Sequence, residues 1–142
     1  MASKETLREV MTTRPIVLDA SASVCDAAKA MRENDVGDVL VRRNGKLCGI
    51  VTDRDIVVRV LAEEQDPSAT TLAEICTDEL VCLAPDCEIG DAVEVMAEKA
   101  IRRIPVVDEN DQALGIVSLG DLAIERDRQS ALGKISAAPP SH

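Results

Sequence analysis

The chain has 142 residues, a formal net charge of −10, 46% hydrophobic residues and no Phe, Tyr or Trp. This composition excludes aromatic cages and aromatic base-stacking platforms, and the acidic balance disfavours nucleic-acid and anionic-membrane binding, which need a basic face. No segment approaches the roughly 18 apolar residues of a membrane span and the N-terminus has no signal-peptide pattern, so we expect a cytoplasmic protein with no nucleic-acid or membrane partner.

Helix and strand signals alternate through the first half of the chain. Pro15 disfavours a helix immediately before it and starts an extended segment. Ser23 can cap a helix together with Asp26, and Asn44-Gly45 tolerates the positive φ angles of a hairpin turn. In chain order we expect a lead-in helix at 7–11, a strand at 16–18, a helix after Ser23, strands at 39–42 and 47–52, and a helix at 53–62.

The second half repeats this order after a polar linker at 64–71. We expect a lead-in helix at 72–76, strands at 80–83, 104–107 and 114–118, a turn at 109–112, and helices at 89–99 and 119–126. Residues 128–142 are small and polar and predict a disordered tail. His142, the only histidine, lies in that tail and is a poor candidate for catalysis or metal binding.

The two halves are copies of one another. The offset is 65 residues at the front, as from Asp26 to Asp91, and 66 after one inserted residue, as from Asp55 to Asp121. A repeat of this size is too short to bury a full core alone. We therefore expect an α/β (α+β) fold in which two β-α-β-β-α repeats, at 7–63 and 72–127, pack with pseudo-twofold symmetry.

Five cysteines are spread along the chain without a Cys-x-x-Cys pair. An odd number of this kind suggests reduced thiols, and the sister positions in the other repeat are all small or apolar. We therefore interpret the cysteines as small hydrophobic residues. They are Cys25, Cys48, Cys76, Cys82 and Cys87.

Each half carries Gly-Ile-Val-(Thr/Ser)-x-x-Asp at a strand-to-helix junction, at 49–55 and 115–121. The hydroxyl of Thr52 or Ser118 lies near a helix N-terminus, where unpaired N–H groups favour a phosphate. Asp55 or Asp121 follows on the first turn, and a carboxylate can accept from two adjacent hydroxyls. These features describe a ribonucleotide site. The same spacing also forms a capping box that binds nothing, and the two interpretations can coexist.

The pair of repeats resembles the tandem cystathionine beta-synthase (CBS) domain, or Bateman module, of the short stand-alone bacterial type. The marks are Gly49-Ile-Val-Thr-Asp-Arg-Asp55, Arg102-Arg103-Ile104-Pro105-Val106-Val107-Asp108 and Gly115-Ile-Val-Ser-Leu-Gly-Asp121. The second half is also similar to the last repeat of the gamma subunit of AMP-activated protein kinase. Modules of this family share an architecture and differ in what they bind.

The resemblance implies two ligand clefts, each combining the motif of one repeat with the first strand of the other. In the Asp121 cleft, phosphate and ribose would be held by Arg103, Ser118 and Asp121, and the base by Thr12, Ile16, Val17, Val36 and Gly37. The Asp55 cleft would use Thr52, Arg54, Asp55, Thr77, Val81, Cys82, Ile101 and Arg102.

The two clefts are unequal in charge. Gly37-Asp38 stands in the first repeat where the second has Arg102-Arg103. A charge-assisted hydrogen bond contributes about 1.5–3 kcal/mol, which corresponds to roughly ten- to a hundredfold in affinity. We expect tighter binding at the Asp121 cleft, with Arg54 partly compensating the other. Arg102-Arg103 could equally be a solvated edge or a set of dimer salt bridges.

The resemblance implies a non-catalytic sensor of adenosine-type nucleotides (AMP, ADP, ATP or S-adenosylmethionine) that needs no cofactor or metal and signals to a partner protein in trans. It also implies a homodimer that buries apolar helix faces, with Val57, Val60 and Leu61 exposed in the monomer. One alternative is a dimeric interaction or stress-response scaffold with vestigial clefts. A redox sensor at Cys82 is a second alternative. An enzyme is disfavoured because no nucleophile stands beside a base.

Overall fold

The computed structural model describes residues 6–76 and 80–125 and divides into two compact units. Unit 2 is Arg14–Val81, and unit 1 combines Met1–Thr13 with Cys82–His142. Each unit holds a three-stranded sheet with helices, so the expected mixed α/β fold is confirmed. The expected tail at 128–142 lies outside the described residues.

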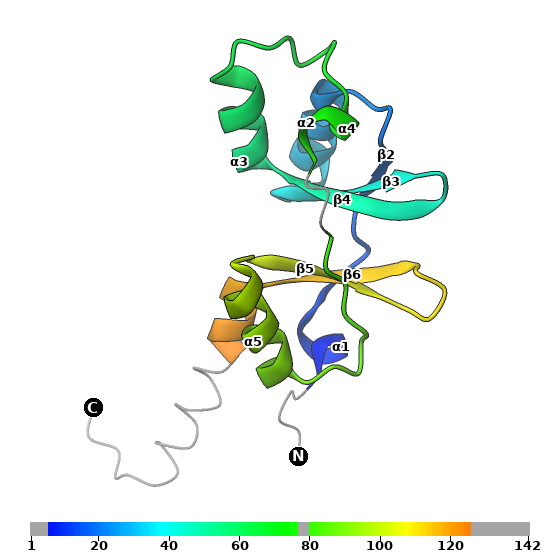
Figure 1. Ribbon diagram of the computed structural model, residues 1–142, viewed down its shortest axis with the longest axis vertical. Coiled ribbons are helices and arrows are strands. Elements are labelled where there is room, and N and C mark those ends of the chain that lie inside the picture. The colour runs from blue at the N-terminus through cyan, green and yellow to red at the C-terminus, as the bar shows by residue number, and fades with distance from the viewer. Residues whose placement is uncertain (1–5, 77–79, 126–142) are drawn as a thin grey trace, which may run out of the picture. The chain divides into compact units, whose positions relative to one another are not determined.

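The sheet of unit 2 has the strand order β2-β3-β4. β2 runs parallel to β3, and β3 pairs antiparallel with β4 through a turn at Asn44 (φ 53°) and Gly45 (φ 78°), as the Asn-Gly signal predicts. Helices α2, α3 and α4 lie on one face of this sheet (Figure 1). The elements are β2 (Val17–Asp19), α2 (Val24–Asn34), β3 (Asp38–Arg43), β4 (Lys46–Thr52), α3 (Asp53–Ile56), η1 (Val57–Leu61) and α4 (Leu72–Ile75).

The sheet of unit 1 has the strand order β1-β6-β5, with both pairs antiparallel. Its helices again lie on one face of the sheet (Figure 1). The elements are α1 (Leu7–Val10), β1 (Thr12–Thr13), α5 (Ile89–Lys99), β5 (Arg103–Val107) and β6 (Ala113–Ser118), followed by helical residues 119–125.

Each unit has its own apolar core, built from aliphatic side chains as the lack of aromatic residues requires. In the expected helices, the apolar spacing places one residue per turn inward, such as Val24, Ala27 and Met31 on α2. Ser23 caps that helix as predicted: its hydroxyl accepts from the Asp26 amide at 3.0 Å. The α5 bounds agree with the expected 89–99.

Each lead-in helix packs on the other repeat, an exchange that the sequence pattern does not reveal. Leu7 of α1 is fully buried in the core of unit 1, and its amide donates to the Cys87 carbonyl at 3.0 Å. The equivalent Leu72 of α4 is fully buried in unit 2 and donates to the Ala22 carbonyl at 2.9 Å. The compact units therefore differ from the sequence repeats at both ends.

The expected strand at 80–83 does not form; only Leu83 makes an isolated parallel bridge, to Val106. In unit 2 the amide of Leu40 donates to the Ile16 carbonyl at 2.8 Å. Pro105 stands at the position equivalent to Leu40 and has no N–H to give to Val81. The segment 80–83 therefore lacks the hydrogen bond at Val81 that would extend its pairing with β5.

The helix expected at 53–62 is α-helical only to Ile56 and continues as the π-helix η1. Its closing bond runs from the Ala62 amide to the Val57 carbonyl at 2.9 Å. Val60 is fully buried, so its expected exposure is wrong, whereas Val57 and Leu61 are both 55% exposed. Val60 follows Ile56 by four residues and shares its inward face.

Candidate functional site

The first Gly-Ile-Val-Thr-x-x-Asp motif forms a capping box at the start of α3. The Thr52 hydroxyl accepts from the Asp55 amide at 3.1 Å, and the Asp55 Oδ2 accepts from the Thr52 amide at 2.8 Å. The capping interpretation is therefore realised at this site. An ionised carboxylate has about four lone-pair positions, so this bond leaves capacity for ligand hydroxyls.

The other amides at the start of α3 have partners within the chain. The Asp53 amide donates to the Gly37 carbonyl at 2.9 Å, and the Arg54 amide donates to the Asp53 Oδ1 at 2.8 Å. Unpaired N–H donors were expected at this helix start, and that expectation is wrong for the amides of residues 53–55. The carboxylate of Asp53 also brings negative charge to the place proposed for a phosphate.

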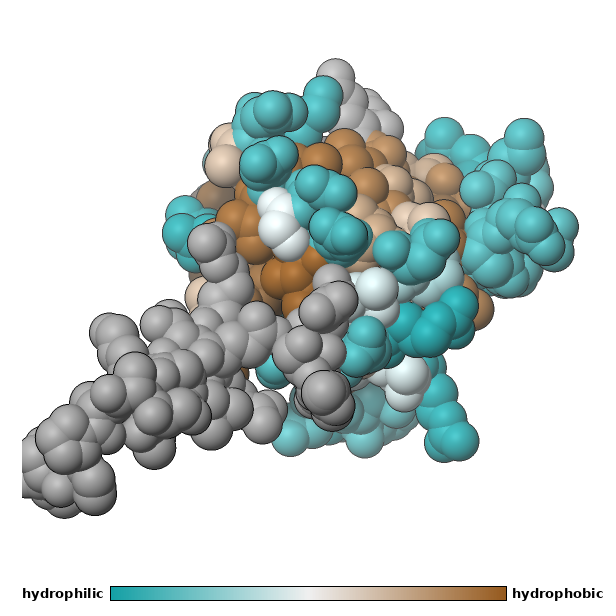
Figure 2. All heavy atoms as spheres, turned by 90° about the horizontal axis from the view of Figure 1, so that it is seen from below, coloured by the Kyte–Doolittle hydropathy of each residue, from teal (hydrophilic) through white to brown (hydrophobic). Residues whose placement is uncertain are grey.

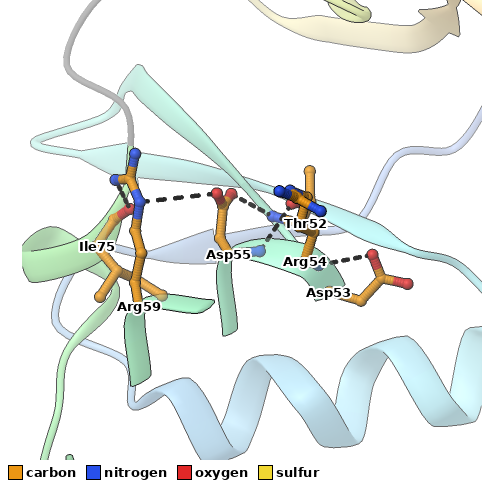
Figure 3. A network of polar contacts seen from close by, with 6 residues as sticks. All are labelled: Thr52, Asp53, Arg54, Asp55, Arg59 and Ile75. Carbon is orange, nitrogen blue, oxygen red and sulfur yellow. Dashed lines mark hydrogen bonds and ion pairs between the residues drawn. The ribbon is translucent and has the colours of Figure 1, made fainter. Parts of the chain in front are cut away.

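The carboxylate of Asp55 has a second partner, Arg59. The Arg59 Nε lies 3.9 Å from the Asp55 Oδ1, and the Arg59 Nη1 donates to the Ile75 carbonyl at 3.0 Å. Figure 3 shows these contacts in sequence, from Thr52 through Asp55 and Arg59 to Ile75. Arg59 was not among the predicted site residues, although an arginine four residues after an aspartate in a helix is a recognisable pairing signal.

The second motif repeats two of these contacts in unit 1. The Asp121 amide donates to the Ser118 hydroxyl at 3.0 Å, and the Leu119 amide donates to the Arg102 carbonyl at 2.7 Å. Leu119 replaces Asp53, so residue 119 supplies no carboxylate to cap the amide of Gly120. The start of this helix is accordingly less negative and better suited to an anion than the start of α3.

The strand opposite each motif differs in charge. Arg103 is the register partner of Ser118 in the β5·β6 ladder, and Asp38 is the register partner of Thr52 in the β3·β4 ladder. Directly opposite residues of an antiparallel pair have side chains on the same face. The unequal charge noted in the sequence therefore lies beside the two motif hydroxyls.

The structure distributes the predicted site residues over both units. Unit 1 holds Thr12, Cys82, Ile101, Arg102, Arg103, Ser118 and Asp121. Unit 2 holds Ile16, Val17, Val36, Gly37, Thr52, Arg54, Asp55 and Val81. Thr77 lies outside the described residues. Within unit 1, the pairing of β1 with β6 brings Thr12 to the strand that ends at Ser118.

Cys82 lines a cavity of about 530 Å³ in unit 1, beside Leu83, Val107 and Leu114. Burial, and secondarily the Asp111 carboxylate, raise the pKa of the Cys82 thiol. A raised pKa keeps the thiol protonated and poorly nucleophilic at neutral pH. This environment is unlike that of a redox-sensing cysteine.

Two other kinds of site are not found in the described part of the chain. No group of His, Cys, Asp and Glu residues there could hold a metal ion. None of the described helices is both long and apolar enough to cross a membrane.

A family model described as "CBS domain" matches residues 7–62 and 72–127. The "CBS domain-containing protein YhcV" of Bacillus subtilis is 36% identical over 127 residues, which are 89% of each chain. A solved hexameric CBS-CP12 protein from bloom-forming cyanobacteria has a TM-score of 0.76 and 28% identity, covering 93% of this chain and 83% of its own. The CBS domain pair of protein MJ0100, solved with 5′-methylthioadenosine and S-adenosyl-L-methionine, has a TM-score of 0.77 and 25% identity, covering 87% and 97%.

Proposed function

The chain belongs to the CBS domain family, and we propose that it is a regulatory module that binds an adenosine-type ligand at its two Gly-Ile-Val-(Thr/Ser)-x-x-Asp motifs and signals to a separate protein. The proposed ligands are AMP, ADP, ATP and S-adenosylmethionine. The role is non-catalytic and cytoplasmic, and requires no cofactor.

The observation that carries this proposal is the repetition of one local geometry at two sites. Each motif places a hydroxyl and a half-buried carboxylate at the start of a helix. The first amide of each helix donates to the backbone carbonyl of the residue just before the opposite strand, which is Gly37 or Arg102. Capping alone does not require the same Gly-Ile-Val strand before the hydroxyl at both places. Support also comes from the MJ0100 domain pair, which binds two adenosyl compounds.

We propose that the motif at Ser118 and Asp121 binds more tightly. Arg103 lies opposite Ser118. Leu119 stands where the first motif has Asp53 and is followed by Gly120, so neither of the first two residues of this helix carries a carboxylate. The motif at Thr52 and Asp55 has Asp38 opposite it. Like charge near a phosphate lowers affinity, so we expect this site to be the weaker one.

We also propose that the working form is a homodimer. The helices that follow the two motifs expose apolar side chains that a monomer would leave in water. These are Val57, Val58 and Leu61 after the first motif, and Leu119 and Ile124 after the second. On the face that Figure 2 displays, hydrophobic residues gather between hydrophilic ones. The hexameric CBS-CP12 relative shows that proteins of this family assemble.

The same apolar residues support a second candidate, a dimeric scaffold with vestigial ligand sites. In that case the two motifs serve only to cap their helices: Thr52 and Asp55 form a capping box, and the Ser118 hydroxyl accepts from the Asp121 amide. The two candidates differ in their response to ligand and agree on the dimer.

The deciding experiment is thermal unfolding, followed by circular dichroism, with AMP, ADP, ATP and S-adenosylmethionine. A ligand at about a hundred times its dissociation constant should stabilise the fold by about 2.7 kcal/mol. The Asp121→Ala variant should abolish most of this shift, and Asp55→Ala should reduce it. The matched control is Asp26→Ala, which removes the equivalent capping box at Ser23 but leaves both motifs intact.

The two candidates then separate cleanly. If Asp26→Ala keeps the full ligand shift while Asp121→Ala loses it, the aspartate does more than cap. If no compound in the panel moves the midpoint of the wild-type chain, the scaffold is the better account.

A further inference from the structure

Arg59 joins two elements that are far apart in sequence. Its Nε lies 3.9 Å from the Asp55 Oδ1 on its own helix, and its Nη1 donates to the carbonyl of Ile75, sixteen residues further along, at 3.0 Å. A planar guanidinium presents donors along separate edges, so one side chain can contact both acceptors at once. Figure 3 shows Arg59 between these two acceptors.

The acceptor on the far side is the last residue of α4. Carbonyls in the last turn of a helix have no partner within it, so an outside donor fixes their position. Ile75 itself is 5% exposed and packs in the same core as Ile56 and Val60.

The contact is too exposed to be explained as a source of stability. The side chain of Arg59 is 52% exposed and that of Asp55 is 21% exposed. Ion pairs of this kind contribute little to folding because water screens them and ordering a long side chain costs entropy. Their effect is on position: Asp55 is held by the Thr52 amide on one oxygen and faces Arg59 with the other.

The second repeat cannot form the same bridge. Glu125 occupies the position equivalent to Arg59, and Val10 is equivalent to Ile75. A glutamate offers no guanidinium, so it cannot contact a carboxylate and a backbone carbonyl as a double donor in the way that Arg59 does. The bridge is therefore a property of the first repeat alone.

We propose that Arg59 is a positioning residue for the ligand bound at Thr52 and Asp55, and that it transmits occupancy of this motif to the C-terminal end of α4. This inference rests on the proposed function, which supplies the ligand. A ligand that engages the Asp55 carboxylate changes what Arg59 can contact, and Arg59 carries that change to Ile75. The weaker motif is then the one that reports its state to α4.

The experiment uses the full chain with saturating S-adenosylmethionine and, separately, AMP. Hydrogen exchange is measured over residues 72–76, and affinity is measured by calorimetry. In the wild-type chain, ligand should increase the protection of α4. Arg59→Ala should lose that increase and weaken binding at the Asp55 motif by about fivefold or more, without changing the Asp121 motif.

Two variants control for charge and for folding. Arg32→Ala removes an exposed arginine from α2 of the same unit, where its side chain is 75% exposed, and should behave as wild type. Arg59→Lys keeps the charge, but an ammonium can reach only one of the two acceptors, so it should bind more tightly than Arg59→Ala and still fail to protect α4. In an Asp55→Ala background, Arg59→Ala should have no further effect on affinity.

The outcomes distinguish the two proposals. If ligand binds, Asp55→Ala weakens it, and Arg59→Ala behaves as Arg32→Ala, the positioning role is overturned and the proposed function stands. Full protection of α4 in Arg59→Lys would also overturn it, because charge alone would then suffice. If neither compound binds the wild-type chain, the proposed function fails and this inference fails with it.

Discussion

Arg103 lies directly opposite Ser118 across the β5·β6 ladder. The pairing places a permanent cation beside a hydroxyl that caps a helix, and it has no counterpart in the first repeat, where the opposite residue is Asp38. This strand position is one of the differences in charge between the two motifs, beside the replacement of Asp53 by Leu119.

Replacing Arg103 should therefore affect one site only. Arg103→Ala should weaken binding of AMP at the Ser118–Asp121 motif by about 1.5–3 kcal/mol, or roughly ten- to a hundredfold, because a charge-assisted hydrogen bond to phosphate is lost. Calorimetry of the full chain measures this directly. Lys99→Ala, which removes an exposed cation from α5 of the same unit, should leave the affinity unchanged. Equal losses in the two variants would show that general charge, and not Arg103, attracts the ligand.

Gly115 permits the close approach of β1 to β6. A Cβ at this position would lie 2.6 Å from the Thr12 carbonyl oxygen, which is backbone and cannot move aside cheaply. Gly115→Ala should destabilise the fold by about 1–3 kcal/mol and displace β1. Gly90→Ala is the matched control: it lies exposed in α5, and an added Cβ meets no atom within 4 Å. Urea unfolding should show Gly90→Ala stabilised by about 0.5–1 kcal/mol; a similar loss in both variants would contradict the packing argument.

Glu74 should make the capping of α4 sensitive to acid. Hydrogen bonds from the Thr71 amide, and then from its hydroxyl, hold the pKa of Glu74 below its ordinary value of 4.5. Because the folded-state pKa is the lower one, the contribution of Glu74 is complete above pH 4.5 and is lost as pH falls through the folded value. Unfolding of wild type and Glu74→Gln from pH 7 to 3 should show a difference that disappears in acid. Glu94→Gln on α5 is the control, and a constant difference for Glu74→Gln would exclude the linkage.

Cys82 should react slowly with alkylating agents. Burial, and secondarily Asp111, raise its pKa above the ordinary value of 9.0, so little thiolate exists at neutral pH. A chain that keeps Cys82 as its sole cysteine should react with iodoacetamide more slowly when folded than in urea. Asp111→Asn should accelerate the folded-state reaction modestly. Rapid reaction of the folded chain would instead revive the redox role.

The repeat and its periodic apolar residues were sufficient to predict the fold class and most elements. Local signals are reliable where a single residue dominates the backbone, as Ser23 does at a helix start and Gly45 in a turn. The prediction of a strand at 80–83 was wrong because Pro105, on the neighbouring strand β5, has no N–H to donate to this segment. The missing donor is recognised only when the segment is known to lie beside β5.

The site was predictable in part for a related reason. Thr52, Asp55, Ser118 and Asp121 form local hydrogen bonds within three residues, and their spacing reveals them. The hydrogen bond from Arg59 to Ile75 joins residues sixteen positions apart, and it depends on how α4 packs beside η1. Its acceptor is a backbone carbonyl, which every residue has, so the sequence gives no sign of it. The hydrogen bond from the Asp53 amide to the Gly37 carbonyl could not be predicted, because the pairing of β3 with β4 brings Gly37 to the start of α3.

The exchange of the lead-in helices means that neither copy of the duplicated sequence is a self-sufficient folding unit. A chain cut between residues 64 and 71 would yield two fragments, each carrying a helix whose hydrogen-bond acceptors lie on the other fragment. Each fragment alone would leave two backbone carbonyls and an apolar groove open to water. Mixing the fragments should restore both at once, so the two pieces should complement each other in solution although no covalent bond joins them.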